Sequence, residues 1–162
     1  MRSRLALVVL SFATACGGPE KVTTIVEPPP RDLGPLEVGP VAPEQRHLDA
    51  ESYTIDVEGP PTAPVKGKVV ATVTLKTKGD LAIQNLKDWR IEPKGPRDVD
   101  FSAPIIAPLK PPLDKNTVQV QVSVVPLRGG VKHLAFRLGG TVCNSDFCDV
   151  VADQVSFNLD VK

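Results

Sequence analysis

The chain is poor in histidine and cysteine, which supply most zinc ligands and many catalytic groups. Its 162 residues include two histidines, three cysteines and one tryptophan. A zinc site would need two ligands beyond the cysteine pair near the C-terminus, and the histidines, His47 and His133, lie far apart in the chain. No Gly-x-Ser-x-Gly motif, phosphate-binding glycine loop or calcium-loop spacing occurs. The sequence therefore predicts no metal, no cofactor, and no hydrolase or transferase.

An excess of charge and long hydrophobic runs are also lacking. Nineteen Lys and Arg residues balance nineteen Asp and Glu residues, and no basic cluster stands out. This balance argues against nucleic acid as a partner and against a polybasic membrane patch. No segment reaches the roughly 20 consecutive apolar residues that a transmembrane helix needs.

The first residues have the pattern of an export signal. Arg2 and Arg4 form a charged start, an apolar run follows over residues 5–12, and Ala13-Thr14-Ala15 supplies the small residues of a cleavage site. The sequence therefore predicts a signal peptide over residues 1–15.

Cys16 follows these small residues directly. This arrangement resembles the lipobox of bacterial lipoproteins, although Ala13 stands where leucine is usual. The resemblance implies lipidation of Cys16 and anchoring in a membrane with the chain facing the periplasm, and Gly17, in place of aspartate, favours the outer membrane. The alternative is ordinary cleavage, which would leave Cys16 as a free thiol.

Residues 16–48 are predicted to form a flexible tether. Seven prolines lie between Pro19 and Pro43, and the hydrophobic residues there have no period. Such a segment is largely extended, at about 3 Å per residue. The alternative is that part of it packs on the following domain as an irregular arm.

Residues 49–162 are predicted to form one all-β domain, because apolar and polar residues alternate with the period of two that is typical of strands. Prolines and glycines separate the stripes, and Gly129-Gly130 fits a hairpin turn. About seven such strands suggest a β-sandwich, with Trp89 as a packing residue. The predicted stripes contain Tyr53–Val57, Val69–Leu75, Ile83–Ile91, Val99–Ile106, Val118–Val125, Leu134–Leu138 and Val155–Val161.

Cys143 and Cys148 lie between two predicted strands, in the run Thr-Val-Cys-Asn-Ser-Asp-Phe-Cys. Four intervening residues allow a disulfide if the chain turns back, and export would place the pair where disulfides persist. Closing so small a ring stabilises the fold by only about 2 kcal/mol in the entropic model. Local rigidity and redox chemistry are the other reasons for such a bond.

This run, followed by an alternating strand, resembles the N-terminal domain of the thiol:disulfide interchange protein DsbD and its relatives over roughly Ser52 to Val161. The resemblance implies an immunoglobulin-like antiparallel β-sandwich in which Cys143 and Cys148 exchange electrons with periplasmic partners. The sequence departs from the family in three ways. Asp149-Val150-Val151 replaces the prolines usual after the second cysteine, no aromatic residue occurs over 104–114, and the membrane and thioredoxin-like parts are absent.

The charges near the pair weigh against a reactive thiol. Asp146 and Asp149 flank Cys148, and the loop has no Lys or Arg, so a raised thiol pKa is expected unless Arg137 or Lys132 approaches in space. Cysteine–histidine catalysis would need a free thiolate beside His133, and His133 is expected to face solvent.

Two functions remain open. The first is a lipid-anchored envelope protein whose Cys143–Cys148 pair exchanges disulfides with a thioredoxin-like protein or a membrane electron carrier. The alternative is a non-catalytic binding or structural lipoprotein in which the same disulfide is inert. Whether the chain is an enzyme depends on which of the two holds.

Overall fold

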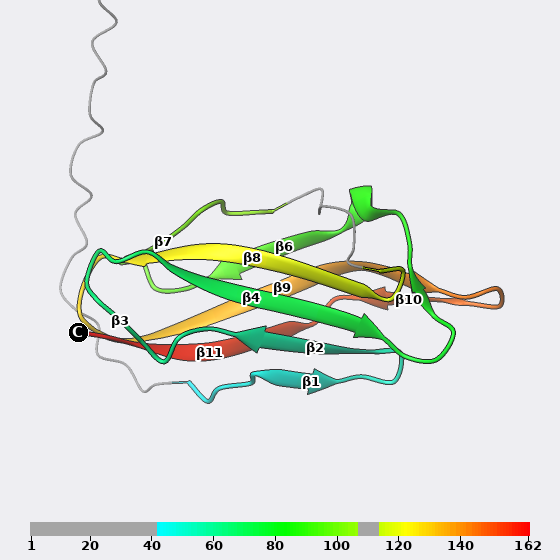
Figure 1. Ribbon diagram of the computed structural model, residues 1–162, viewed down its shortest axis with the longest axis horizontal. Coiled ribbons are helices and arrows are strands. Elements are labelled where there is room, and N and C mark those ends of the chain that lie inside the picture. The colour runs from blue at the N-terminus through cyan, green and yellow to red at the C-terminus, as the bar shows by residue number, and fades with distance from the viewer. Residues whose placement is uncertain (1–41, 107–113) are drawn as a thin grey trace, which may run out of the picture. The chain divides into compact units, whose positions relative to one another are not determined.

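The computed structural model describes residues 42–106 and 114–162 (Figure 1). The predicted signal peptide, the lipidation site Cys16 and most of the predicted tether lie outside the described residues, as does the middle of the proline-containing stretch 104–114. No described helix has the length and hydrophobicity to cross a bilayer.

The first sheet has five strands, and all of its pairs are antiparallel. Its long members carry the alternation expected from the sequence, with buried residues at every second position. In spatial order the strands are β1 (His47–Asp49), β2 (Tyr53–Glu58), β4 (Val69–Thr77), β8 (Thr117–Pro126) and β7 (Val99–Phe101).

The second sheet is built around its longest strand, β9 (Gly130–Cys143). One edge of β9 pairs with β10 (Cys148–Val151) and β11 (Gln154–Val161), and the other pairs with β5 (Ala82–Ile83) and β6 (Arg90–Lys94). The short β3 (Thr62–Ala63) pairs parallel to the end of β11. A 3-10 turn, η1 (Leu86–Asp88), separates β5 from β6.

The two sheets bury their apolar faces against each other. The ring of Phe136 on β9 stacks on that of Phe157 on β11, with centroids 6.1 Å apart, and each fully buried large side chain is worth roughly 1.5–3 kcal/mol. Trp89 is fully buried, which confirms it as a packing residue. The domain is therefore the immunoglobulin-like, largely antiparallel β-sandwich that the sequence predicted.

The strands β9, β10 and β11 form one long hairpin with a constant register. The pairing runs from Val161 opposite Gly130 to Cys148 opposite Cys143 without a gain or loss of a residue. The glycine pair Gly139-Gly140 therefore forms no bulge, because β9 contains no extra residue there.

The extra residues lie instead in the neighbouring strand pair. Ile83 pairs with Val142 and Arg90 pairs with Gly139, so seven residues of this segment advance along only three residues of β9. The four additional residues are accommodated in the loop between β5 and β6, which contains η1. The predicted strand over 83–91 is interrupted for this reason.

The domain begins earlier in the sequence than predicted. The backbone of Gln45 exchanges two hydrogen bonds with Ser156 on β11, of 3.1 and 2.9 Å, and the Arg46 guanidinium lies 5.1 Å from the centroid of the Phe157 ring. His47, assigned to the tether, is the first residue of β1. The boundary at residue 49 is therefore corrected toward the N-terminus, because residues 44–48 supply hydrogen bonds and a strand to the sandwich.

Candidate functional site

The site centres on the disulfide between Cys143 and Cys148, which closes the tip of the long hairpin. The two residues are directly opposite each other, with Cα atoms 4.1 Å apart. This separation is close to the roughly 4.5 Å of an antiparallel pair that shares no backbone hydrogen bonds. The bond therefore follows from the hairpin register.

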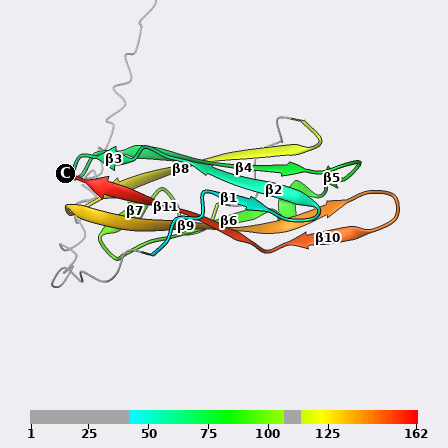
Figure 2. The same cartoon turned by 90° about the horizontal axis from the view of Figure 1, so that it is seen from below.

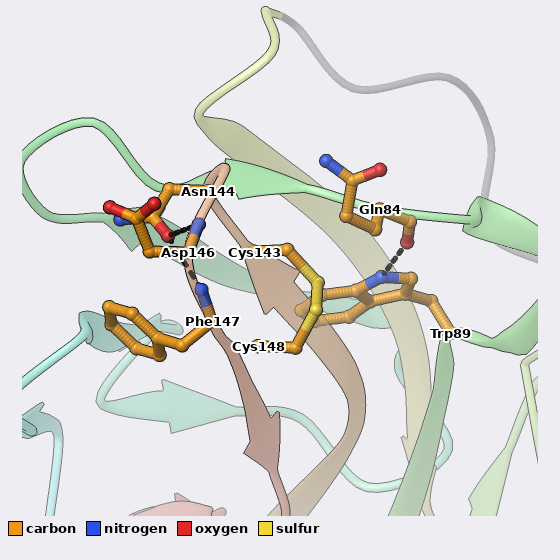
Figure 3. The surroundings of a disulfide bond; sticks show 7 residues. All are labelled: Gln84, Trp89, Cys143, Asn144, Asp146, Phe147 and Cys148. Carbon is orange, nitrogen blue, oxygen red and sulfur yellow. Dashed lines mark hydrogen bonds between the residues drawn. A yellow bond between two sulfur atoms is a disulfide. The ribbon is translucent and has the colours of Figure 1, made fainter.

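The four-residue loop between the cysteines is held by Asn144. Its side-chain Oδ1 accepts hydrogen bonds from the backbone N–H groups of Asp146 and Phe147, at 2.9 and 3.0 Å (Figure 3). Its Nδ2 donates to the carboxylate of Asp80 at 3.1 Å, and its own N–H donates to the Phe147 carbonyl at 3.1 Å. An asparagine in this role is typical of tight turns, and it fixes the positions of both cysteines.

The two cysteines differ in their exposure. Cys143 retains 9% of its accessible surface, whereas Cys148 is exposed. Cys143 lies on the central strand, flanked by β10 on one side and by Ala82 of β5 on the other. Cys148 is the first residue of β10, which among the described strands pairs with β9 alone. An incoming reagent would therefore meet Cys148 first.

The hairpin tip lies at the end of the sandwich opposite the C-terminus. Figure 1 shows the tip projecting beyond the neighbouring strands, and Figure 2, from a perpendicular direction, shows the same. Phe147 in the loop is 52% exposed and Val150 on β10 is 68% exposed. Two exposed apolar residues thus lie within two positions of the more exposed cysteine in the sequence.

A hollow of about 480 Å³ adjoins Cys148. Among the described residues, Lys78 is the only cation that lines it, and this ammonium is already bound, by an ion pair with Asp49 and a 2.5 Å hydrogen bond to the Ala50 carbonyl. The hydrogen bond from Lys78 lowers the pKa of the Asp49 carboxyl. The lining residues are Glu51, Ser52, Lys78, Gly79, Leu81, Phe147, Cys148 and Asp149.

The two cations considered for the cysteines belong elsewhere. Lys132 pairs with Leu159 near the opposite end of the hairpin and forms a buried 2.5 Å ion pair with Asp98. Arg137 pairs with Gln154 and lines a separate hollow of about 200 Å³. Neither lines the hollow beside Cys148.

The histidines also lie away from the disulfide. His133 pairs with Asn158 and shares a 3.0 Å hydrogen bond with its Oδ1, and His47 is bound to Asp56 at 2.7 Å. His133 is ten residues from Cys143 along one strand, about 33 Å when fully extended. The geometry brings no imidazole to either sulfur. Among the described residues, no three His, Cys, Asp or Glu side chains cluster as a metal site would require.

Sequence reasoning identified the cysteines but not their surroundings. It missed the exposed Phe147, the exposed Val150 and the contribution of Lys78, which comes from the turn after β4. The one available signal was the apolar character of Phe147 and Val150 on either side of a cysteine.

Comparison with known proteins finds similarity of fold only. No protein-family model matches the sequence, and no curated protein matches it. Similar solved structures include a CARDB domain from Pyrococcus furiosus in complex with two metal ions, at 14% identity over 71% of this chain and 93% of that one, with a TM-score of 0.41. A cohesin module of a Clostridium perfringens family 33 glycoside hydrolase shares 11% identity over 68% of this chain and 96% of that one, with a TM-score of 0.45. The major subunit of an Escherichia coli aggregative adherence fimbria shares 13% identity over 72% and 99%, with a TM-score of 0.36.

Proposed function

We propose that the chain is a lipid-anchored protein of the cell envelope whose domain takes part in thiol–disulfide exchange through Cys143 and Cys148. The observation that carries the proposal is the unequal exposure of the two cysteines, with Cys148 exposed beside a hollow and Cys143 buried. Exchange requires that one sulfur be open to an external thiolate while the other can leave. The sequence resemblance to the DsbD N-terminal domain supports the same function.

The chemistry balances with a protein dithiol as the reductant. A partner thiolate forms a bond to Sγ of Cys148, the Cys148–Cys143 bond breaks, and Sγ of Cys143 leaves with the electron pair and takes up a proton. The partner's second thiolate then attacks the mixed disulfide and releases Cys148. The partner ends as a disulfide and this chain as a dithiol, so two electrons and two protons have moved.

The reduction potential of the pair tests the proposal. A domain with a potential between about −180 and −270 mV would lie in the range of exchange proteins, and one below about −300 mV would behave as a structural disulfide. The chain would be equilibrated in dithiol buffers and its free thiols counted by mass, with Cys16→Ser in place to remove the third cysteine. The lower potential would refute exchange.

Trapping experiments supply a matched pair of variants. Cys143→Ser leaves Cys148 free to hold a mixed disulfide with a partner, and Cys148→Ser leaves only the buried Cys143. We expect the first variant to accumulate disulfide-linked partners and the second to accumulate far fewer. Equal trapping by both would contradict the assignment of Cys148 as the attacked sulfur.

Anchoring is tested separately. The leader followed by Cys16 supports lipidation, and in a bacterial host we expect labelled palmitate to be incorporated into the chain and the label to be lost in Cys16→Ser. Label that persists in the variant would show that Cys16 does not carry the lipid.

A second function is favoured by the charges of the site. Asp149 lines the hollow with Cys148, and Lys78, the one cation among the described residues that line it, is bound to Asp49, which leaves little positive charge to stabilise a thiolate. On this alternative the disulfide is inert, it fixes the hairpin tip, and the exposed tip binds a partner without redox chemistry. The potential measurement separates the two functions.

A further inference from the structure

Within the described residues, one edge of β10 is not paired with another strand. We propose that an extended, cysteine-bearing segment of the partner adds to this edge as a β-strand, which brings its thiolate into line with the Cys148–Cys143 bond. This inference rests on the exchange function proposed above and specifies how the attacking thiol is positioned.

The register shows which backbone groups are available. Asn144 donates its N–H to the Phe147 carbonyl, so these residues form a hydrogen-bonded pair. Because such pairs alternate along an antiparallel ladder, Cys143 and Cys148 form a pair without hydrogen bonds to each other. The N–H and C=O groups of Cys148, and of Val150 two residues later, therefore point away from β9. Within residues 42–106 and 114–162, no backbone group bonds to them.

Native proteins protect exposed edges with very short strands, charged side chains, proline, bulges or covering segments. Within the described residues, this edge has no lysine, proline, bulge or covering segment, and Asp149 is its one charged side chain. The strand β10 has the sequence Cys-Asp-Val-Val, its register contains no bulge, and Val150 is 68% exposed. Its continuation β11 is covered, by Gln45 opposite Ser156 and by β3. Among the described residues, the part of the edge that no segment covers is the part that carries the disulfide.

An added strand would place a third sulfur in a row with the other two. The residue opposite Cys148 on an added antiparallel strand would form a hydrogen-bonded pair with it, at a Cα separation of about 5.5 Å. This lies within the range of about 4.4–6.8 Å that a disulfide requires. Cys143 lies on the other side of Cys148, at 4.1 Å.

Alignment of the sulfurs matters because the attacking thiolate must approach along the axis of the breaking bond. Side chains of directly opposite residues on neighbouring strands point to the same face of a sheet. A partner cysteine opposite Cys148 would therefore attack its Sγ from the side away from Cys143. The new bond forms to Sγ of Cys148, and Sγ of Cys143 leaves with the electron pair as a thiolate, which then takes up a proton from water.

The surroundings define the chemistry of the segment. The hollow beside Cys148 presents the carboxylates of Glu51 and Asp149, and the charge of its lysine, Lys78, is offset by Asp49. A basic residue beside the partner's cysteine complements these charges. The exposed Val150 favours an apolar residue two positions from the cysteine. A second copy of this chain fits less well, because pairing of two β10 edges would bring together two disulfides and no thiolate.

Synthetic peptides test this inference. The probe is acetyl-Thr-Val-Thr-Cys-Lys-amide, whose valine would lie opposite Val150 when its cysteine lies opposite Cys148. The reference is N-acetylcysteine amide, which cannot form a strand. The rate of mixed-disulfide formation on the full chain carrying Cys16→Ser is followed by mass and corrected for thiolate fraction. We expect the peptide to react at least about tenfold faster than the reference, as docking raises the effective concentration of its thiol.

Backbone methylation provides the matched control. An N-methyl group on the peptide's valine removes the N–H that would face β10, and one on the threonine before the cysteine removes an N–H that would face away. We expect the first to abolish the rate advantage and the second to retain it. Equal effects of the two methyl groups would overturn strand addition.

Variants of the chain examine the same contact from the other side. Val150→Pro removes the outward N–H, and Val150→Thr keeps it with a β-branched side chain. We expect the ratio of peptide rate to reference rate to fall toward one in the first variant only. Should Val150→Pro fail to fold, hydrogen exchange replaces it, because in the mixed disulfide of Cys143→Ser with the peptide the amides of Cys148 and Val150 would exchange at least about tenfold more slowly.

The outcomes distinguish this inference from the function on which it rests. If the reference thiol reacts and the peptide is no faster, exchange stands and strand docking is wrong. If neither reacts and the potential lies below the range of exchange proteins, both are wrong. A dimer in solution that Val150→Pro dissociates would assign the edge to a second copy and would also overturn the inference.

Discussion

The indole ring of Trp89 lies directly on the main chain of Gly140. A Cβ atom built on Gly140 would lie 2.2 Å from Cδ2 of the ring, closer than any side chain can come. The ring is fully buried, and its Nε1 donates a 2.8 Å hydrogen bond to the Gln84 carbonyl (Figure 3). The loop between β5 and β6 is thus packed, through Trp89, against Gly140 of β9, three residues before Cys143.

Substitution of Gly140 tests this contact. In Gly140→Ala the new methyl group must displace the buried indole, so we expect a loss of about 3 kcal/mol in the free energy of unfolding. Urea titration of the oxidised chain would measure it. Gly139→Ala is the matched control, because its Cβ would lie 3.4 Å from the flexible side chain of Arg90, and a change under about 0.5 kcal/mol is expected. Equal losses in the two variants would contradict the close contact.

The main strands were predictable because their apolar residues alternate. The stripes at Tyr53–Val57, Val69–Leu75 and Val118–Val125 became β2, β4 and β8 with the expected faces buried. The short β1, β3 and β10 were not predicted, since two to four residues are too few to show a period. Their pairing depends on partners distant in the sequence, which alternation cannot reveal.

The site was predictable only in part for the same reason. Proximity of Cys143 and Cys148 followed from four intervening residues between two strands. Which of them is exposed depends on the strands that flank each one. Cys143 has described neighbours on both sides, β10 and β5, whereas Cys148 has one only on the β9 side. The contact between Gly140 and Trp89 could not be predicted either, because it depends on the register in which β6 pairs with β9.

The buried ion pair between Lys132 and Asp98 gives a prediction for stability. The two side chains retain 6% and 12% of their exposure and lie 2.5 Å apart. Lys132→Met would leave a buried carboxylate without a cation, at a cost of about 3–5 kcal/mol. We expect the double variant Lys132→Met, Asp98→Asn to recover most of this loss. A single variant that costs under about 1 kcal/mol in urea titration would show that the pair is well solvated.

Tyr53 gives a prediction for alkaline pH. Burial, together with its hydrogen bond to the Asp153 carboxylate, strongly raises the pKa of the Tyr53 phenol. The unfolded chain therefore releases this proton more readily than the folded one. The contribution of Tyr53 is fully present below its unfolded pKa of about 10 and is lost as the pH rises above that value.

Comparison with Tyr53→Phe isolates this contribution from other groups that titrate at high pH. We expect the wild-type chain to lose more stability than the variant between about pH 8 and about pH 11, since phenylalanine has no proton to release. Urea midpoints at the two pH values would measure the difference. Parallel losses would show that the phenol ionises equally well in the folded protein.

Reduction of the disulfide should reveal two thiols of different reactivity in a domain that remains folded. Opening a ring of this size costs only about 2 kcal/mol, less than the 5–15 kcal/mol that folded domains typically retain. Cys148 is exposed and Cys143 is buried against β5, so we expect iodoacetamide to modify Cys148 at least about tenfold faster. Peptide mapping of briefly labelled chain would give both rates, and labelling in urea would equalise them. Equal rates without urea would mean that the hairpin tip opens on reduction, and the assignment of Cys148 as the sulfur that meets a partner would then lose its structural basis.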